Sequence, residues 1–204
     1  MLLIYALTFR SSSKKNDLVA LKEALDNDSV ALRALSTHAI NYLYLLDAYL
    51  ATKKSAVSPQ HYLEIGRGYP EGAFELQLYF FTHCIIGASQ FYTEAIPPED
   101  LFIYREMLRL SEKIIKENFK KISLDNKCEF LVCARMCHYI PSIEPSILHE
   151  VDQSISQDGN FLIDICNAKA SPDERNDLIG AEHRNVLYLM SQMPSHYSAK
   201  DPLK

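Results

Sequence analysis

Apolar residues recur at every third or fourth position along most of the chain, which is the period of helices that bury one face. The longest example covers residues 29–52, where one face carries Leu32, Leu35, Ala39, Leu43, Leu46 and Leu50. Helix starts are expected at Ser29, at Ser58-Pro59, at Pro70-Glu71 (which opens a run to about residue 95), at Ser123 and at the capping box Ser171-Pro172-Asp173-Glu174. The pattern predicts an all-α fold of about eight or nine helices.

The connections between these runs are short, which predicts antiparallel helix pairs. Taken two by two, the helices give hairpins at about 15–52, 58–95, 97–140 and 145–192, each in the length range of helical repeats. We therefore expect one helical domain over residues 15–193, an N-terminal segment of uncertain structure at 1–14 and a polar tail at 194–204. Because the second helix of each pair is the more apolar, a curved stack with the second helices inside is favoured.

Composition narrows the class of protein. The chain has 204 residues, of which 48% are hydrophobic and 23% charged, as in a folded domain. A net charge of -5 with dispersed basic residues disfavours binding to nucleic acid or to a membrane surface, and no apolar run is long enough for a membrane helix. The 5 cysteines lie mostly in apolar runs, which favours free thiols and a cytoplasmic location.

Histidines recur in the second helices of the expected hairpins, at His38, His83, His138 and His183. Neutral imidazole is a good metal ligand and a base near pH 7. Curved inner helices would bring several imidazoles to one pocket, so the candidate catalytic residues are His38, His83, His183 and the neighbouring Glu182. The alternative interpretation is that each histidine is a half-buried core residue, hydrogen-bonded to a neighbour.

Cysteines beside these histidines extend the hypothesis to metals. Candidate ligands for zinc or iron are His38, His83, Cys84, Cys137, His138 and His183. The chain lacks the tight C-x-x-C pairs of thiolate sites, and neighbouring helices lie about 8–10 Å apart. For these reasons no metal or other cofactor is favoured, and the cysteines are interpreted instead as small buried apolar residues.

Tyrosines concentrate in the two long inner runs, where their contact area and hydroxyl would suit a binding groove, although filling of the core is the alternative. Candidate ligand-binding residues are Tyr42, Tyr49, Tyr79, His83, His138, His183 and Asn185. Motifs of serine hydrolases, phosphate-binding loops, zinc proteases and dinucleotide-binding folds are absent from the sequence.

The sequence therefore favours a non-catalytic interaction protein. It would bind a peptide, a protein partner or a small apolar ligand on an aromatic, histidine-lined concave face, with its oligomeric state open. One alternative is an enzyme or metal-binding protein with a pocket of histidine and glutamate, with or without cysteine, between the inner helices. A second alternative is a structural subunit of a helical assembly.

Overall fold

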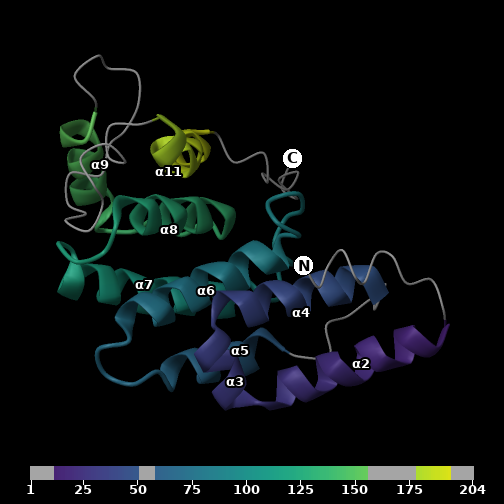
Figure 1. Cartoon of the computed structure of the whole chain (residues 1–204). Helices are drawn as coiled ribbons and strands as arrows, with labels where there is room; N and C mark the ends of the chain where they lie inside the picture. Colours follow the sequence, from purple (N-terminus) through teal and green to yellow (C-terminus); the bar gives the residue numbers. More distant parts are fainter. Residues whose placement is uncertain (1–11, 51–57, 156–177, 194–204) are drawn as a thin grey trace.

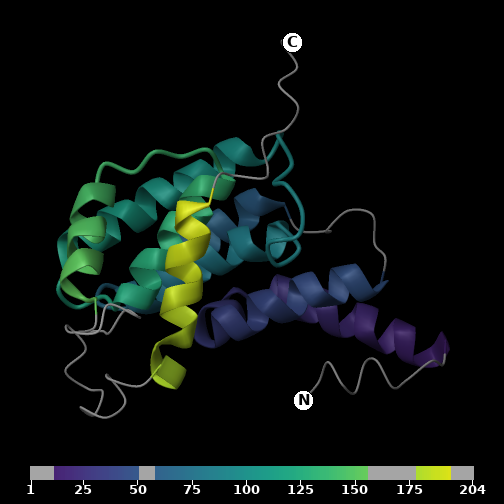
Figure 2. The same ribbon diagram turned by 90° about the horizontal axis from the view of Figure 1, so that it is seen from above.

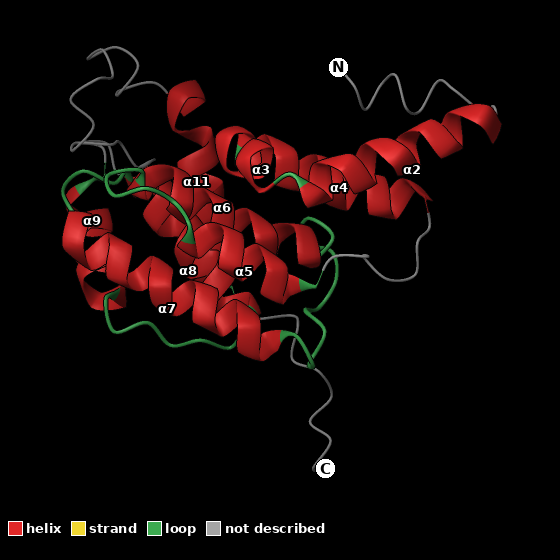
Figure 3. Cartoon of the chain, turned by 90° about the horizontal axis from the view of Figure 1, so that it is seen from below, coloured by secondary structure: helices red, strands yellow, loops and turns green. Residues whose placement is uncertain are grey.

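The computed structural model of the chain describes residues 12–50, 58–155 and 178–193. Every regular element in these residues is a helix (Figures 1 and 3), so the all-α prediction is confirmed. None of the described helices is both long and apolar enough to cross a membrane. In chain order the helices are α2 (Ser12–Asn27), α3 (Ser29–Leu35), α4 (Thr37–Leu50), α5 (Pro59–Arg67), α6 (Phe74–Ala88), α7 (Leu101–Asn118), α8 (Leu124–Met136), α9 (Glu144–Gln153) and α11 (Leu178–Gln192).

Local chemistry fixes several helix starts where the sequence predicts them. Pro59 is the first residue of α5, and its ring presets the backbone angle that a helix needs. Ser123 caps α8, where its side-chain oxygen accepts a hydrogen bond from the amide of Asn126 at 3.4 Å. The expected capping box at Ser171 lies outside the described residues.

The single helix expected over residues 29–52 is instead divided into α3 and α4. Ser36 lies between them with a φ of 45°, a left-handed conformation that interrupts a right-handed helix. The cap also differs from the expected Ser29. The carboxylate of Asp28 accepts hydrogen bonds from two amides of the first turn, at 3.1 and 2.9 Å, and so begins the helix.

Helix α6 lies at the centre of the fold and contacts α3, α4, α5, α7 and α8. It is shorter than the expected run of residues 70–95, because it begins at Phe74 and ends at Ala88. The chain then turns toward α7 through three residues with positive φ, which are Gln90, Phe91 and Tyr92. Most side chains of α6 are buried, as the sequence predicts for an inner helix that is apolar nearly all round.

The second helices of the expected hairpins contact one another in the order α4, α6, α8 and α11. Helix α9 packs on α8, but among the described residues it makes no contact with α11, so these two helices do not form the expected fourth hairpin. Figure 1 shows α11 nearly end-on above α8, and Figure 2 shows it lengthwise, so α11 crosses α8 and does not run alongside it. A regular curved stack is therefore not established.

Two glycines allow neighbouring helices to approach α6 closely. A Cβ atom on Gly87 of α6 would lie 2.0 Å from Cδ2 of Tyr44 on α4. A Cβ atom on Gly66 of α5 would lie 2.1 Å from Cε1 of Phe81 on α6. Both aromatic rings are buried in the core and surrounded by other side chains, so they have little room to move aside.

We expect Gly87→Leu to destabilise the fold by about 1 to 3 kcal/mol or more, the usual cost of overpacking a core. The new side chain would occupy the volume of the Tyr44 ring. Urea denaturation measures the change in the free energy of unfolding. As a control, Ala48→Leu adds a similar side chain at an exposed position of α4 and should change that free energy by less than about 0.5 kcal/mol. Unchanged stability of Gly87→Leu would contradict the packing of α6 against α4.

Candidate functional site

Three of the four recurring histidines lie on α4, α6 and α11, close enough for the charges of two of them to act on the third. His83 on α6 is half-buried, whereas His38 on α4 and His183 on α11 are exposed. Burial, together with the charges that His183 and His38 carry when protonated, lowers the pKa of His83 to about 4. His38 and His183 are therefore both within electrostatic reach of His83. We call this group, with the buried Glu129 of α8, the histidine face.

The ring of His83 is held by one neighbour on each side. Its Nδ1 atom lies 2.9 Å from Oδ1 of Asn41 on α4, and its Nε2 atom lies 3.7 Å from Oε2 of Glu129. An amide oxygen only accepts hydrogen bonds, so Nδ1 carries the proton of the neutral ring. The lone pair on Nε2 consequently faces the carboxyl group of Glu129.

Glu129 is a buried carboxyl group in an unusual environment. Burial raises its pKa to about 7, a hydrogen bond from Thr82 opposes the rise, and the negative charge of Asp125 adds to it. The Oγ1 atom of Thr82 donates to Oε1 of Glu129 at 2.5 Å. Because the pKa of His83 is about 4, the pair of His83 and Glu129 holds one proton between about pH 4 and pH 7. Chemically, such a pair is able to donate or accept a proton near neutral pH.

Three contributors to this site were missed by the sequence analysis: Asn41, Thr82 and Glu129. Glu129 lies within a helix that is buried on almost every side, directly before the apolar residues 130–134. A lone acid inside such a run is the signal that could have found it, because an isolated carboxyl is rarely buried without a partner. Glu182, the acid that the sequence favoured beside the histidines, is exposed on α11.

The sequence analysis left open that His183 is a half-buried core residue, but its side chain is exposed. The buried side of α11 is formed by Arg184, Leu187 and Ser191, and Nε of Arg184 lies 3.3 Å from Oδ1 of Asp125 on α8. Adjacent residues of a helix point about 100° apart, so His183 falls at the edge of this contact.

The opposite side of α11 carries an apolar stripe, which consists of Val186, Leu189 and Met193. Their exposed fractions are 48%, 62% and 51%. The three residues are spaced by three and four positions and therefore share one side of the helix. The stripe begins one turn after His183, so the exposed apolar side chains continue from the histidine face.

The remaining histidine lies elsewhere. His138 follows the end of α8 with a φ of 50° and is exposed, and its charge is not among those that act on His83. Burial raises the pKa of Cys137 to about 12 and raises that of Cys84 well above its usual range, so both thiols stay protonated near neutral pH. In the parts of the chain that the structure describes, no three histidine, cysteine or acidic residues are placed to hold a metal ion.

The candidate tyrosines are divided between the site and other surfaces. The ring centroid of Tyr79 lies 6.3 Å from that of His83, so Tyr79 borders the histidine face. Tyr42 of α4 and Asn185 of α11 are half-buried, and Tyr49 is exposed near the end of α4. Tyr79 therefore lies beside His83, whereas the ligand-binding roles of all four residues stay predictions.

Comparison of the chain with models of protein families, with characterised proteins and with solved structures gives no match. The geometry of the site therefore carries the functional argument.

We expect Glu129→Gln to gain stability relative to the wild type as the pH rises from 4.5 through 7. Folding raises the pKa of Glu129 from 4.5 to about 7, so the folded wild-type protein resists an ionisation that the unfolded chain undergoes freely. Between these pH values the free energy of unfolding of the wild type therefore falls by up to about 1.4 kcal/mol per pH unit, and that of the glutamine variant does not. Urea denaturation of both proteins at several pH values measures the difference.

The contribution of His83 has the opposite slope. Folding lowers its pKa from 6.5 to about 4, so its part of the stability is lost as the pH falls through that range. This contribution of His83 is present in both the wild type and Glu129→Gln, so it largely cancels when their free energies of unfolding are subtracted. Glu182→Gln, at an exposed carboxyl, is the control and should give a difference that does not vary with pH. If the difference in free energy of unfolding between Glu129→Gln and the wild type is also independent of pH, Glu129 is not held in its neutral form.

Proposed function

We propose that this protein is an interaction module that binds a segment of a partner protein across the histidine face and the apolar stripe of α11. The observation that carries the proposal is the contact of His83 with Glu129, together with the action of the charges of His38 and His183 on His83. These four residues come from four helices that are far apart in the sequence. Their juxtaposition is therefore a property of the folded surface and not of any local motif.

The pair of His83 and Glu129 does not help the fold. A buried carboxyl and a half-buried imidazole lose hydration, and apolar side chains of similar volume would often be at least as stable. Ionisable groups with shifted pKa values are found preferentially at functional sites. The hydration that His83 and Glu129 lose on burial therefore supports a functional role for the pair at the neighbouring surface.

The apolar stripe supplies the second part of a binding surface. Contiguous exposed apolar side chains on a soluble protein usually mark an interaction site. The three residues of the stripe match the spacing with which one helix packs on another, which favours an amphipathic helical segment as the partner. On this arrangement the partner covers the stripe, and its polar edge accepts hydrogen bonds from His183 and His38.

The test is selection of binding peptides from a displayed library of amphipathic helical sequences against the purified full-length protein. We expect selected peptides to perturb the NMR signals of His38, His183 and Leu189 on binding. Leu189→Ser and His183→Ala should each weaken binding at least about tenfold, the effect of losing about 1.4 kcal/mol. Because both side chains are exposed, the melting temperatures of the two variants should match that of the wild type. A library without binders, or peptides that map to another surface, would contradict the proposal.

A second candidate function, acid–base catalysis, is favoured by one observation. The pKa of Glu129, raised to about 7 by burial, is the value expected of a general acid or base at neutral pH. The expected result is hydrolysis of an activated nitrophenyl ester with a rate that changes through pH 7. Glu129→Gln should remove this pH dependence, whereas Glu182→Gln should leave it intact. A rate without this dependence in the wild type would exclude Glu129 as the catalytic group.

A further inference from the structure

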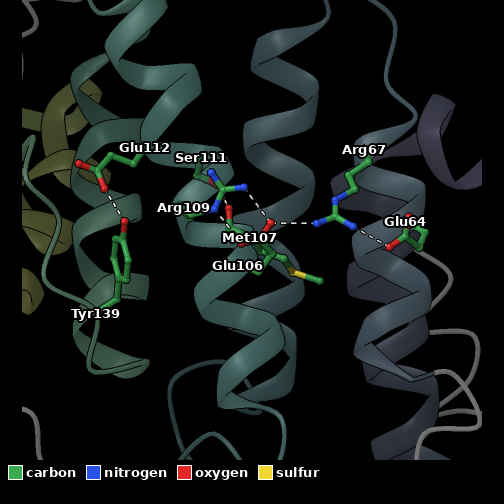
Figure 4. A network of polar contacts seen from close by, with 8 residues as sticks. All are labelled: Glu64, Arg67, Glu106, Met107, Arg109, Ser111, Glu112 and Tyr139. Atoms are coloured by element: carbon green, nitrogen blue, oxygen red, sulfur yellow. Dashed lines mark hydrogen bonds and ion pairs between the residues drawn. The ribbon is translucent and has the colours of Figure 1, made fainter.

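A row of four alternating charges crosses the surface of α5 and α7 (Figure 4). Glu64 pairs with Arg67 at 2.8 Å, and Arg67 pairs with Glu106 of α7 at 2.8 Å. Glu106 in turn accepts two hydrogen bonds from Arg109, at 2.7 and 2.9 Å. All four side chains remain partly exposed to solvent, so the order along the surface is negative, positive, negative, positive.

Such a row is complementary to its own reversed copy. When a second row is laid antiparallel to the first, Glu64 faces Arg109 of the other copy and Arg67 faces Glu106 of the other copy. A twofold axis through the ion pair of Arg67 and Glu106 produces both contacts twice, as an isologous interface requires. We propose that this chain forms a twofold-symmetric dimer through the surface of α5 and α7, with the reversed rows in register.

Apolar side chains flank the row and would supply affinity. Phe102 and Ile140 are 76% and 89% exposed, the two most exposed large apolar side chains among the described residues. Phe102 precedes Glu106 by four residues and so lies one turn away on the same side of α7. Ile140 lies in the segment that follows α8. Arg105 of α7 donates a hydrogen bond from Nε to the carbonyl of Cys137 at 2.8 Å, which keeps that segment beside α7.

The segment with Ile140 is also fixed at its far end. Glu112 of α7 accepts hydrogen bonds from the hydroxyl of Tyr139 (Figure 4), from the hydroxyl of Ser142 at 2.6 Å and from the amide of Ile143 at 3.1 Å. A side chain on an anchored segment loses little conformational freedom when it is covered. Ile140 is therefore held exposed beside the charged row before any partner binds.

The two kinds of contact would have different roles. Exposed ion pairs contribute little free energy in water, so the charged row mainly sets the register and excludes mismatched surfaces. Burial of the two flanking apolar side chains would supply most of the affinity. A weak dimer that dissociates further at high salt is the expected behaviour.

The experiment is sedimentation equilibrium of the full-length protein over a range of concentrations. Arg109→Glu places like charges opposite Glu64 of the second copy, and Glu64→Arg places like charges opposite Arg109, so each variant alone should be monomeric. When the two variants are mixed, every cross-copy contact again joins opposite charges and a heterodimer should form. Within each chain the new repulsion is the same in monomer and dimer, so restored association reports the interface itself.

Phe102→Ser should weaken the dimer at least tenfold, and Leu189→Ser, on the apolar stripe of α11, should not change it. The second variant also separates this proposal from peptide binding at the histidine face. Circular dichroism melts confirm that each variant is folded. A wild-type protein that stays monomeric at every concentration overturns the proposal. A dimer that persists in the single variants, or a mixture of variants that stays monomeric, overturns it equally.

Discussion

The fold depends on the close approach of α4 and α5 to α6 at two glycines. Gly87 leaves room for the ring of Tyr44, and Gly66 leaves room for the ring of Phe81. Because both rings fit against these glycines, α6 can contact helices from both halves of the described chain. It therefore lies between α4 and α8 and contacts both. The same packing brings Asn41, His83 and Glu129 together, so the geometry of the histidine face follows from the core.

Two buried lysines in the described part of the chain have oppositely charged partners, unlike Glu129 of the histidine face. The ammonium group of Lys22 lies 2.7 Å from Asp26 and 3.3 Å from Asp47. Lys127, which is fully buried, lies 2.5 Å from Glu150 and 4.0 Å from the ring centroid of Phe119. In these pairs the attraction of opposite charges offsets part of the lost hydration. Glu129 has a neutral imidazole and another carboxyl as neighbours, so its burial is not offset in this way.

The sequence predicted those parts of the structure that depend on local chemistry. Helix periodicity and the caps at Pro59 and Ser123 act within a few residues, and the structure confirms them. The break at Ser36 could not be read from the sequence, because serine has no particular preference for a φ of 45° and tertiary packing imposes it. The crossing of α11 over α8 likewise depends on contacts between residues distant in the chain.

The candidate site shows the same division. Spacing in the expected repeat grouped His38, His83, His138 and His183. The charges of His38 and His183 act on His83, whereas that of His138 is not among those that do. The spacing did not identify Glu129, since a side chain's partner across a helix interface leaves no trace in the periodicity of either helix. The sequence analysis also did not predict which of the three imidazoles is the more buried: His83 is half-buried, whereas His38 and His183 are exposed. An imidazole at the boundary of the buried side of a helix faces solvent or core according to the crossing angle, which the sequence does not encode locally.

The two proposed surfaces use different sides of the molecule, and this separation has a consequence. Figure 1 shows α11 on one side of α8 and α5 on the other, with α6 and α8 between them. Association through α5 and α7 would therefore leave α11 uncovered in both copies. A dimer would present two histidine faces at a fixed separation, and a partner with two binding segments would be retained by both. Under that arrangement a weak interaction at each face is sufficient for stable recognition, because the second contact forms at a high effective concentration.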